Sequence, residues 1–196
     1  KECMIDWLEP FVGMKIVDVA GGTGDVSARF LKRIDGLGEA VVCDPNSAMI
    51  EYGKKKNEFA NQIKWINAPA ENLPFENEFF DAYLVSFGIR NFDDMKQSLN
   101  EAHRVLKVGG RFICLEFSKV QNKDLSKLYS LYSKIIPIFG KLIVGNEKPY
   151  QYLTKTIERF PTQEKFKQII EQSNFSNVEF RNLFNGIVAI HSGWKE

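Results

Sequence analysis

The chain has 196 residues, and its 26 Lys and Arg residues against 25 Asp and Glu residues give a formal net charge of +1. Such a balance argues against a dedicated nucleic-acid binder, which usually carries a basic excess. The composition, 44% hydrophobic and 26% charged, is that of a globular protein, the length fits one domain over residues 1–196, and no apolar run reaches the ~18 residues of a membrane span.

The predicted elements alternate between strand and helix in the first 117 residues. In chain order they are a strand at 15–20, a helix at 24–34, a strand at 40–44, a helix at 47–59, strands at 63–67 and 81–87, a helix at 95–106 and a strand at 111–117. Asn46 is the expected N-cap of the second helix, and a turn at Gly109 and Gly110 closes the third. Near-continuous apolar strands separated by helices indicate a parallel sheet that helices cover on both faces.

The pattern changes after this fifth strand. Residues 124–152 contain no convincing strand, so we expect an insertion of one or two helices there, and Thr162 is expected to cap a later helix. Strands at 177–183 and 186–191 are separated only by Phe184 and Asn185, which predicts an antiparallel hairpin at one edge of the sheet. The predicted fold is therefore α/β, a Rossmann-like class I methyltransferase with a mixed seven-stranded sheet, its last strand antiparallel, and helices on both faces.

A glycine-rich loop at residues 18–25 (DVAGGTGD) joins the first predicted strand to the first helix. Gly22 and Gly24 lack the Cβ atom that would keep a ligand away from the backbone. Asp44 ends the next strand, where its carboxylate can accept hydrogen bonds from both hydroxyls of a ribose. We therefore expect a nucleotide-type cofactor at the carboxyl ends of the strands, with a mere tight turn as the alternative.

Two features of this loop favour S-adenosylmethionine over a dinucleotide. The third glycine of the dinucleotide pattern is absent, because Gly22 and Gly24 are followed by Ser27. Asp25 stands in the first helical turn, where it would repel a pyrophosphate. S-adenosylmethionine has no phosphate and carries a sulfonium and an ammonium, which Asp18 and Asp25 would attract. Asp25 has an alternative role as an acid that complements the helix dipole without touching a ligand.

Several longer motifs carry a specific resemblance. Together with the glycine loop they are PAENLPF (69–75), SFGIRN (86–91), RVLKVGGRFICLEFS (104–118), YQYL (150–153), the pair Phe160-Pro161 and NLFNGIVAIHSG (182–193). In this order, over essentially the whole chain, the sequence resembles the ubiquinone/menaquinone biosynthesis C-methyltransferase family (UbiE-type). Family members have further residues ahead of the position that matches Lys1, and the resemblance implies that this part folds over the cofactor.

The resemblance implies cofactor contacts that the local chemistry supports. The expected S-adenosylmethionine-binding residues are Asp18, Gly22, Thr23, Gly24, Asp44, Pro69, Ala70 and Ser86. The Thr23 hydroxyl can donate to the methionine carboxylate, and Ser86 ends the fourth strand beside the methionine part. Pro69 stands where the family often has Asn, which removes a backbone donor, so we expect the adenine contact to rest on Ala70 and Glu71.

The resemblance also implies methylation of a ring carbon of a polyprenylated benzoquinol or naphthoquinol. Ionising a ring hydroxyl, whose pKa is ~10 in a free phenol, makes the adjacent carbon nucleophilic. Arg90 is the candidate to stabilise that oxyanion, and Asn91 to orient the ring, with water carrying the proton away. A structural salt bridge from Arg90 to Asp93 or Asp94 is the alternative.

Other candidates for catalysis are weaker. His103 lies in the middle of a helix and His191 lies on the last strand, away from the expected cofactor, so neither is expected to be a catalytic base. No group of His, Cys and acidic residues has the spacing of a metal site, and no metal is expected. Cys43 and Cys114 lie in apolar runs and are expected to be buried thiols.

The insertion at about 120–155 is expected to form a helical substrate lid for the greasy tail of the quinol. Its apolar and aromatic residues alternate with lysines, which favours peripheral contact with an anionic membrane. The alternatives are helices that close the core or a homodimer contact. We find no signal peptide and expect a cytoplasmic protein, peripheral to the inner membrane, or a mitochondrial matrix protein in a eukaryote.

Three alternative functions stay open at this stage. A methyltransferase of the same fold could act on another small molecule, such as a sterol or a phenol. An NAD(P)-binding oxidoreductase would bind nicotinamide and have no affinity for S-adenosylhomocysteine. A non-catalytic scaffold in a quinone-synthesis complex would bind its ligands without turnover.

Overall fold

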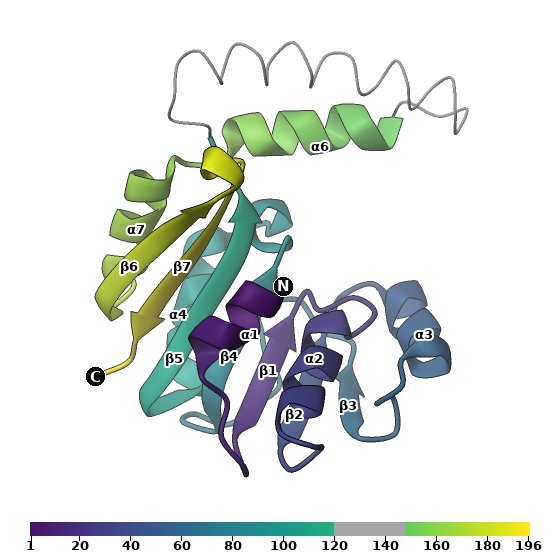
Figure 1. The fold of residues 1–196 in the computed structure, drawn as a ribbon. Coiled ribbons are helices and arrows are strands. Elements are labelled where there is room, and N and C mark those ends of the chain that lie inside the picture. The colour runs from purple at the N-terminus through teal and green to yellow at the C-terminus, as the bar shows by residue number, and fades with distance from the viewer. Residues whose placement is uncertain (120–147) are drawn as a thin grey trace.

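The computed structural model describes residues 1–119 and 148–196, and these form an open sheet with helices on both faces (Figure 1). The strands are β1 (Lys15–Val19), β2 (Glu39–Cys43), β3 (Ile63–Ile66), β4 (Phe80–Ser86), β5 (Leu106–Phe117), β6 (Ser176–Leu183) and β7 (Val188–Trp194). The helices are α1 (Glu2–Leu8), α2 (Asp25–Arg33), α3 (Ser47–Lys56), α4 (Met95–Val105), α6 (Lys148–Arg159) and α7 (Gln163–Glu171), with 3-10 turns η1 (Ile89–Asn91) and η2 (Phe184–Gly186).

The sheet within the described part of the chain has the predicted mixed topology. Its seven strands follow the order β3-β2-β1-β4-β5-β7-β6. The first five strands pair in parallel, and β7 runs antiparallel to both β5 and β6. The predicted terminal hairpin at one edge is therefore confirmed, with η2 as its connection.

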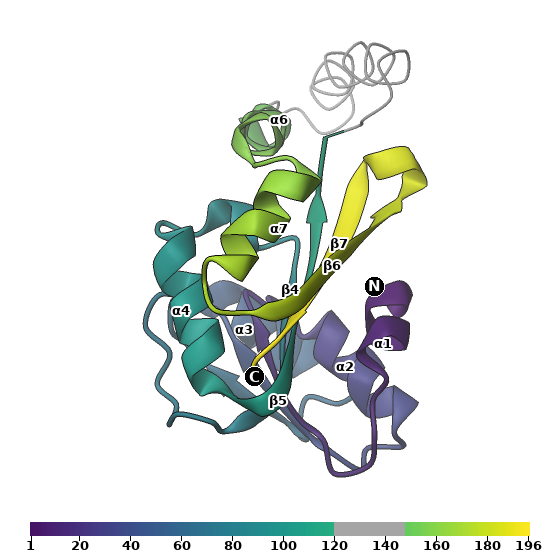
Figure 2. The same ribbon diagram turned by 90° about the vertical axis from the view of Figure 1, so that its left-hand side faces the viewer.

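Hydrophobic side chains fill both spaces between the sheet and its helices. On one face, α1 and α2 pack on the sheet through residues such as Met4, Ile5 and Phe30. On the other face, α4 and α7 pack through residues such as Leu99 and Phe166 (Figure 2). Each fully buried side chain of this kind contributes about 1.5–3 kcal/mol, so the two layers hold the sheet as a rigid platform.

Local signals explain most element boundaries. The side chain of Asn46 accepts hydrogen bonds from the first turn of α3, as predicted, and the hydroxyl of Thr162 accepts one from the Lys165 amide at the start of α7. Helix α1 has no predicted counterpart, because it is only seven residues long and Lys1 supplies no side-chain cap. It is stabilised by burial of Met4, Ile5 and Leu8.

Strand β5 begins earlier than the sequence predicts. The expected turn at Gly109 and Gly110 lies inside the strand, where the register with β4 shifts between the pairs that Phe80 and Ala82 make. Gly109 has a φ of +77° and donates its amide hydrogen to the Lys195 carbonyl oxygen, so the end of the chain holds this irregular part in the sheet. The predicted glycines thus lie in an irregular part of β5 rather than in a turn that precedes the strand.

The predicted substrate lid at about 120–155 lies largely outside the described residues, which resume at the start of α6. Cys43 and Cys114 are buried and free, as expected. In the part of the chain that the structure describes, no helix is long and apolar enough to cross a membrane.

The strand order reverses between β1 and β4, which lie side by side although β2 and β3 separate them in sequence. Val19, the last residue of β1, is aligned with Val85 of β4 on one side and with Cys43 of β2 on the other. The loops that follow these strands therefore meet at one edge of the sheet. Ligands of open α/β sheets bind outside the carboxyl ends of the strands at such a reversal.

Candidate functional site

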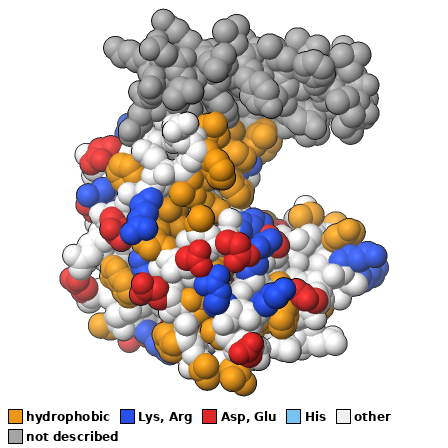
Figure 3. Space-filling view, in the orientation of Figure 1, with side chains coloured by type: hydrophobic (Ala, Val, Ile, Leu, Met, Phe, Trp, Pro, Cys, Tyr) orange, Lys and Arg blue, Asp and Glu red, His pale blue; other side chains and the backbone are white. Residues whose placement is uncertain are grey.

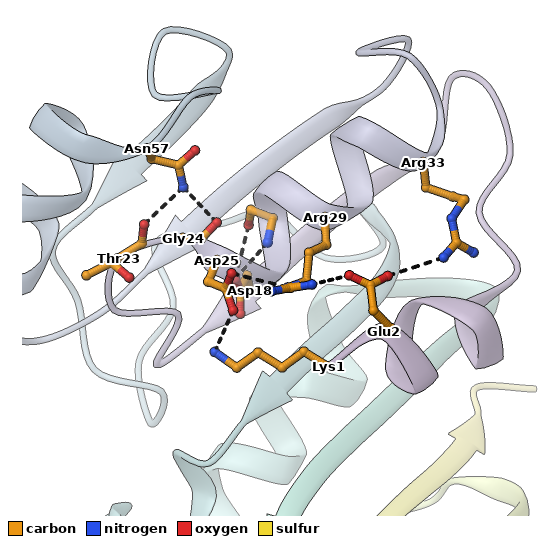
Figure 4. A network of polar contacts seen from close by, with 10 residues as sticks. Lys1, Glu2, Asp18, Thr23, Gly24, Asp25, Arg29, Arg33 and Asn57 are labelled. Carbon is orange, nitrogen blue, oxygen red and sulfur yellow. Dashed lines mark hydrogen bonds and ion pairs between the residues drawn. The ribbon is translucent and has the colours of Figure 1, made fainter.

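The glycine loop lies across the carboxyl ends of β1 and β2. Gly22 and Gly24 have φ angles of +56° and +73°, and a Cβ atom on Gly24 would lie 2.7 Å from the Trp65 ring. The Asn57 side-chain amide donates to the carbonyl oxygens of Thr23 and Gly24 at 3.0 and 2.9 Å (Figure 4). These contacts hold the backbone of the loop in one conformation, close to the sheet.

Asp44 closes the other side of this loop. Its carboxylate is 7% exposed, and its Oδ2 and Oδ1 atoms accept hydrogen bonds from the backbone amides of Gly22 and Asn46 at 2.9 and 2.8 Å. An ionised carboxylate offers about four acceptor sites, so two remain for other donors. The pair of backbone contacts fixes the carboxylate beside the loop, where it can take the hydroxyls of a bound ribose.

Asp18 lies beneath the loop and is fully buried. Its Oδ2 accepts hydrogen bonds from the amide and the hydroxyl of Ser27 at 3.2 and 3.1 Å, while Oδ1 has no hydrogen-bond partner among the residues that the structure describes. Burial raises the pKa of Asp18 to about 7, against the lowering effect of Ser27. Ser27 therefore has a structural function: it anchors the acid that supports the loop.

Asp25, the second predicted cofactor acid, belongs to a network that joins α1 to α2 (Figure 4). It forms ion pairs with Lys1 and Arg29 at 3.0 and 3.2 Å, and Arg29 also pairs with Glu2. Burial alone would raise the pKa of Asp25, but hydrogen bonds and charge from Lys1 and Arg29 lower it. In this arrangement Asp25 is an ionised acid in the first turn of α2, the alternative that the sequence left open.

The segment after β4 approaches the glycine loop closely. A Cβ atom on Gly88 would lie 2.5 Å from the Cβ of Ala20, so only glycine permits this contact. Ala20 and Phe87 have φ angles of +52° and +58°, which are unfavourable for residues with a Cβ. The Ser86 hydroxyl is buried here without a hydrogen-bond partner among the described residues. The structure therefore brings Ser86 to the edge where Asp18 and Asp44 lie.

The turn after β3 contains the residues expected near adenine. Pro69 is exposed and Ala70 is buried. The Glu71 carboxylate accepts hydrogen bonds from the amides of Asp93 and Asp94 at 2.9 and 3.3 Å, so its side chain is held towards the segment before α4. The Glu71 carbonyl oxygen also accepts a hydrogen bond from the Gln97 side chain at 3.4 Å, so both its backbone and its carboxylate are tied to this segment.

Arg90 lies in η1 and its side chain is 10% exposed. Its Nη1 atom donates to Oε1 of Glu116 at 2.9 Å and to the Phe87 carbonyl oxygen at 2.6 Å. The expected alternative partners, Asp93 and Asp94, do not pair with it; the acid is Glu116, 26 residues further along the chain. Burial raises the pKa of Glu116, although Arg90 acts in the opposite direction.

Asn91 is exposed beside Arg90, and its side-chain oxygen accepts a hydrogen bond from the Tyr152 hydroxyl at 3.1 Å. Tyr152 belongs to α6, so this bond links the helix after the undescribed segment to the turn that carries Arg90. The two predicted catalytic residues therefore adjoin each other at the carboxyl end of β4, and Tyr152 reaches them from outside the sheet.

The two histidines take no part in this edge of the sheet. His191 is buried between the rings of Phe166 and Phe180, and its Nε2 lies 3.0 Å from the Gln163 carbonyl oxygen. Burial lowers the pKa of His191 to about 4, so the ring is neutral. His103 is half-buried and meets Phe175 edge-on. Within residues 1–119 and 148–196, no three His, Cys, Asp or Glu side chains converge as metal ligands.

The family model described as "ubiE/COQ5 methyltransferase family" matches residues 1–195. The chain belongs to the ubiE/COQ5 methyltransferase family. The family resemblance of the sequence motifs is thereby confirmed over nearly the whole chain.

Relatives within the ubiE/COQ5 family are similar over the full chain. The ubiquinone/menaquinone biosynthesis C-methyltransferase UbiE of Roseobacter denitrificans is 48% identical over all of this chain and 79% of its own length. The mitochondrial 2-methoxy-6-polyprenyl-1,4-benzoquinol methylase of Bos taurus is 43% identical over all of this chain and 70% of its own length. A solved SAM-dependent methyltransferase from Thermotoga maritima has the same fold, with a TM-score of 0.68 and 20% identity over 99% of this chain and 86% of that one.

Several residues at this site of the ubiE/COQ5 chain could not be identified from the sequence alone. Ser27 was noted only as a missing glycine, and Asn57 follows a helix with no motif around it. Tyr152 and Glu116 lie inside the motifs YQYL and LEFS, which carry the family resemblance, but spacing alone does not reveal what they contact. Their contacts depend on the order of strands in the sheet.

Proposed function

We propose that this chain is an S-adenosylmethionine-dependent C-methyltransferase that methylates a ring carbon of a polyprenylated benzoquinol or naphthoquinol in ubiquinone or menaquinone biosynthesis. The observation that carries the proposal is 43–48% identity, over the whole chain, to relatives whose names state these reactions. The site at the carboxyl ends of β1, β2 and β4 supplies a place where two substrates can meet.

The residues present fit S-adenosylmethionine. Asp44 has free acceptor sites for the ribose, and Thr23 and Ser86 supply hydroxyls at the same edge of the sheet. The loop before α2 lacks the third glycine of the dinucleotide pattern, and the Asp25 carboxylate in the first turn of α2 is paired with Lys1 and Arg29. When bound, this cofactor supplies an electrophilic methyl group. Pro69, Ala70, Gly22 and Gly24 complete the set that would hold it, and Asp18 supports them from beneath.

Arg90 and Asn91 are the residues proposed to act on the quinol. The positive charge of the Arg90 guanidinium favours the ionised form of a nearby ring hydroxyl. The amide of Asn91 can orient the ring by hydrogen bonding, and water takes the proton. A positioned charge of this kind lowers the hydroxyl pKa from ~10 towards neutrality, which makes the adjacent carbon nucleophilic.

Apolar side chains lie on the same side of the site. The rings of Phe87 and Phe117 are 4.7 Å apart at the ends of β4 and β5, and Phe184 at the hairpin tip is 78% exposed. Figure 3 shows hydrophobic side chains gathered over β5 and the hairpin, beside a hollow in the described surface. This arrangement suits the ring and the first part of a prenyl tail.

The remaining parts of the proposal concern partners and location. A helical insertion at about 120–155 would cover the tail of the substrate and rest on an anionic membrane, with the protein peripheral to the inner membrane and otherwise in the cytoplasm or the mitochondrial matrix. The chain would act as a homodimer or within a quinone-synthesis complex. Co-sedimentation with anionic and with neutral vesicles tests the membrane part.

The experiment that tests the cofactor is calorimetric titration with S-adenosylmethionine, S-adenosylhomocysteine and NAD. The proposal predicts binding of the first two and no detectable heat with NAD. Binding of NAD in their place would favour the oxidoreductase alternative and contradict the proposal.

A further inference from the structure

Glu116 is a buried carboxylate that sits against Arg90 at the end of β5. Its side chain is 2% exposed. Oε1 accepts hydrogen bonds from Nη1 of Arg90 at 2.9 Å and from the Phe117 amide at 2.8 Å, and Oε2 lies 3.4 Å from the Arg90 amide nitrogen. Glu116 therefore contacts both the backbone and the side chain of Arg90.

The sheet fixes where Glu116 lies. Strand β5 pairs with β4 through Ser86 and Leu115, and with β7 through Glu116 and Ala189. The Phe87 amide also donates to the Leu115 carbonyl oxygen at 2.8 Å, so the start of the SFGIRN turn is attached to the end of β5. Glu116 thus connects β5, which is paired on both sides, to the SFGIRN turn. Apart from such contacts, this turn is joined to the sheet only through β4.

These contacts leave Arg90 with one defined orientation. Its Nη1 atom is taken by Glu116 and the Phe87 carbonyl oxygen, and its guanidinium carbon lies 5.4 Å from the centre of the Phe117 ring. No hydrogen bond from Nη2 is recorded within the described residues. The guanidinium is therefore held from one side, so that a ligand can approach its other amino group.

A purely structural role explains Glu116 poorly. Burying a carboxylate and a guanidinium carries a desolvation penalty, and well-packed apolar residues in their place are often as stable or more so. The chain nevertheless has a charged pair at the carboxyl end of the sheet, beside the Phe87 and Phe117 rings. This placement indicates that the charge of Arg90 has a function. Fixed groups that need no rearrangement during a reaction stabilise developing charge most effectively.

We propose that Glu116 is a positioning residue for the methylation reaction: it holds the Arg90 guanidinium in the orientation that stabilises the ionised hydroxyl of the quinol. This inference rests on the proposed function, because the quinol oxyanion is the group that Arg90 would meet. Glu116 acts through Arg90 and does not itself touch the substrate.

The first test is Glu116→Gln, which keeps the shape and an acceptor for the Phe117 amide but removes the charge. We expect kcat for quinol methylation to fall about 10- to 100-fold, since small displacements of a positioning group have effects of this size. The KM for S-adenosylmethionine and the affinity for S-adenosylhomocysteine stay within about twofold, because the hydrogen bonds of Glu116 go to Arg90 and Phe117 rather than to the proposed cofactor-binding residues. An unchanged kcat contradicts the proposal.

A double-mutant cycle with Arg90→Ala separates positioning from general stability. If Glu116 acts through Arg90, the double variant loses no more kcat than Arg90→Ala alone. If the two losses multiply, the proposal is wrong. Should Glu116→Gln fail to fold, Glu116→Asp takes its place: a retained charge withdrawn by one methylene is expected to give kcat between the wild type and Arg90→Ala, and wild-type kcat contradicts the proposal.

Glu101 offers a matched control. It is 9% exposed, and it pairs at 2.6 Å with Arg104, another residue of α4. Glu101→Gln is expected to lower the melting temperature and leave kcat at saturating cofactor unchanged. Wild-type turnover is measured in the same series: a folded wild type that methylates no quinol contradicts the proposed function, whereas turnover that Glu116→Gln retains contradicts only the assignment of Glu116.

Discussion

At the scale of single residues, the contact between Gly88 and Ala20 brings the SFGIRN turn against the glycine loop. Ala20 and Phe87 hold left-handed backbone conformations on either side of it, and each such residue costs about 1–2 kcal/mol. Strained residues of this kind persist where the surrounding structure determines them completely, and they gather at functional sites. The close approach therefore fixes the SFGIRN turn against the glycine loop.

Gly88→Ala tests this contact. The new Cβ would lie 2.5 Å from the Cβ of Ala20, so the two loops must separate. We expect affinity for S-adenosylhomocysteine to fall at least tenfold, measured by calorimetry. Gly13→Ala is the control, because Gly13 has a φ of +88° but nothing within 4 Å of an added Cβ. It should lose about 1 kcal/mol of stability with unchanged affinity; equal affinities of the two variants would contradict the assignment.

The raised pKa of Asp18 predicts a pH dependence of stability. The folded protein holds a proton on Asp18 up to about pH 7, whereas the unfolded chain releases it near pH 4. The unfolded state therefore binds fewer protons in this window, and the contribution of Asp18 to the free energy of unfolding falls as pH rises. His191, whose pKa is lowered to about 4, acts in the opposite direction over much of the same range.

Comparison with Asp18→Asn isolates this contribution from that of His191. The stability of the wild type relative to the variant should decline from pH 4 to pH 7, by up to about 1.4 kcal/mol per unit. Chemical denaturation of both proteins at several pH values measures it. Parallel curves would mean that Asp18 is ionised in the folded protein throughout.

At the scale of elements, the bond between Tyr152 and Asn91 connects α6 to η1. Tyr152→Phe removes only the hydroxyl. We expect the KM for the quinol to rise several-fold or kcat to fall by a similar factor, with cofactor affinity unchanged, because Asn91 loses the group that holds it. Tyr52→Phe on α3 is the matched control, since both tyrosines are 57% exposed. Equal kcat and KM values in the two variants would contradict a role for the Tyr152 hydroxyl in methylation.

The elements themselves follow largely from local sequence. Apolar β-branched runs predict the parallel strands, and Asn46 and Thr162 predict the starts of α3 and α7 because a side-chain cap is a short-range interaction. Helix α1 depends on burial of its apolar side chains, and the early start of β5 depends on the contact between Gly109 and Lys195. Neither can be predicted from a local sequence pattern. The glycine loop and Asp44 can likewise be predicted from sequence, because each directly follows a predicted strand.

The partners of the site residues could not be predicted from the sequence. Glu116 meets Arg90 only because β5 lies next to β4, so Asp93 and Asp94, the acids close to Arg90 in sequence, are not its partners. Asn57 supports the glycine loop from a position 33 residues away from Gly24. Contacts between distant segments require the strand order, which propensities and motifs do not specify.

At the scale of the whole molecule, the glycine loop and the turn that carries Arg90 follow neighbouring parallel strands and therefore lie at the same edge of the sheet. The reversal of strand order between β1 and β4 creates this edge, and helix layers on both faces keep it rigid. We predict that both substrates bind there and that the methyl group passes to a ring carbon.

Transfer of a labelled methyl group tests that claim most directly. The protein is incubated with S-adenosylmethionine carrying a CD₃ group and with a 2-methoxy-6-polyprenyl-1,4-benzoquinol, and the product is analysed by fragmentation mass spectrometry. We predict a product in which CD₃ replaces one ring hydrogen, at a rate that Arg90→Ala reduces strongly. Label on a ring oxygen, or no transfer by folded protein that binds both substrates, would contradict the account.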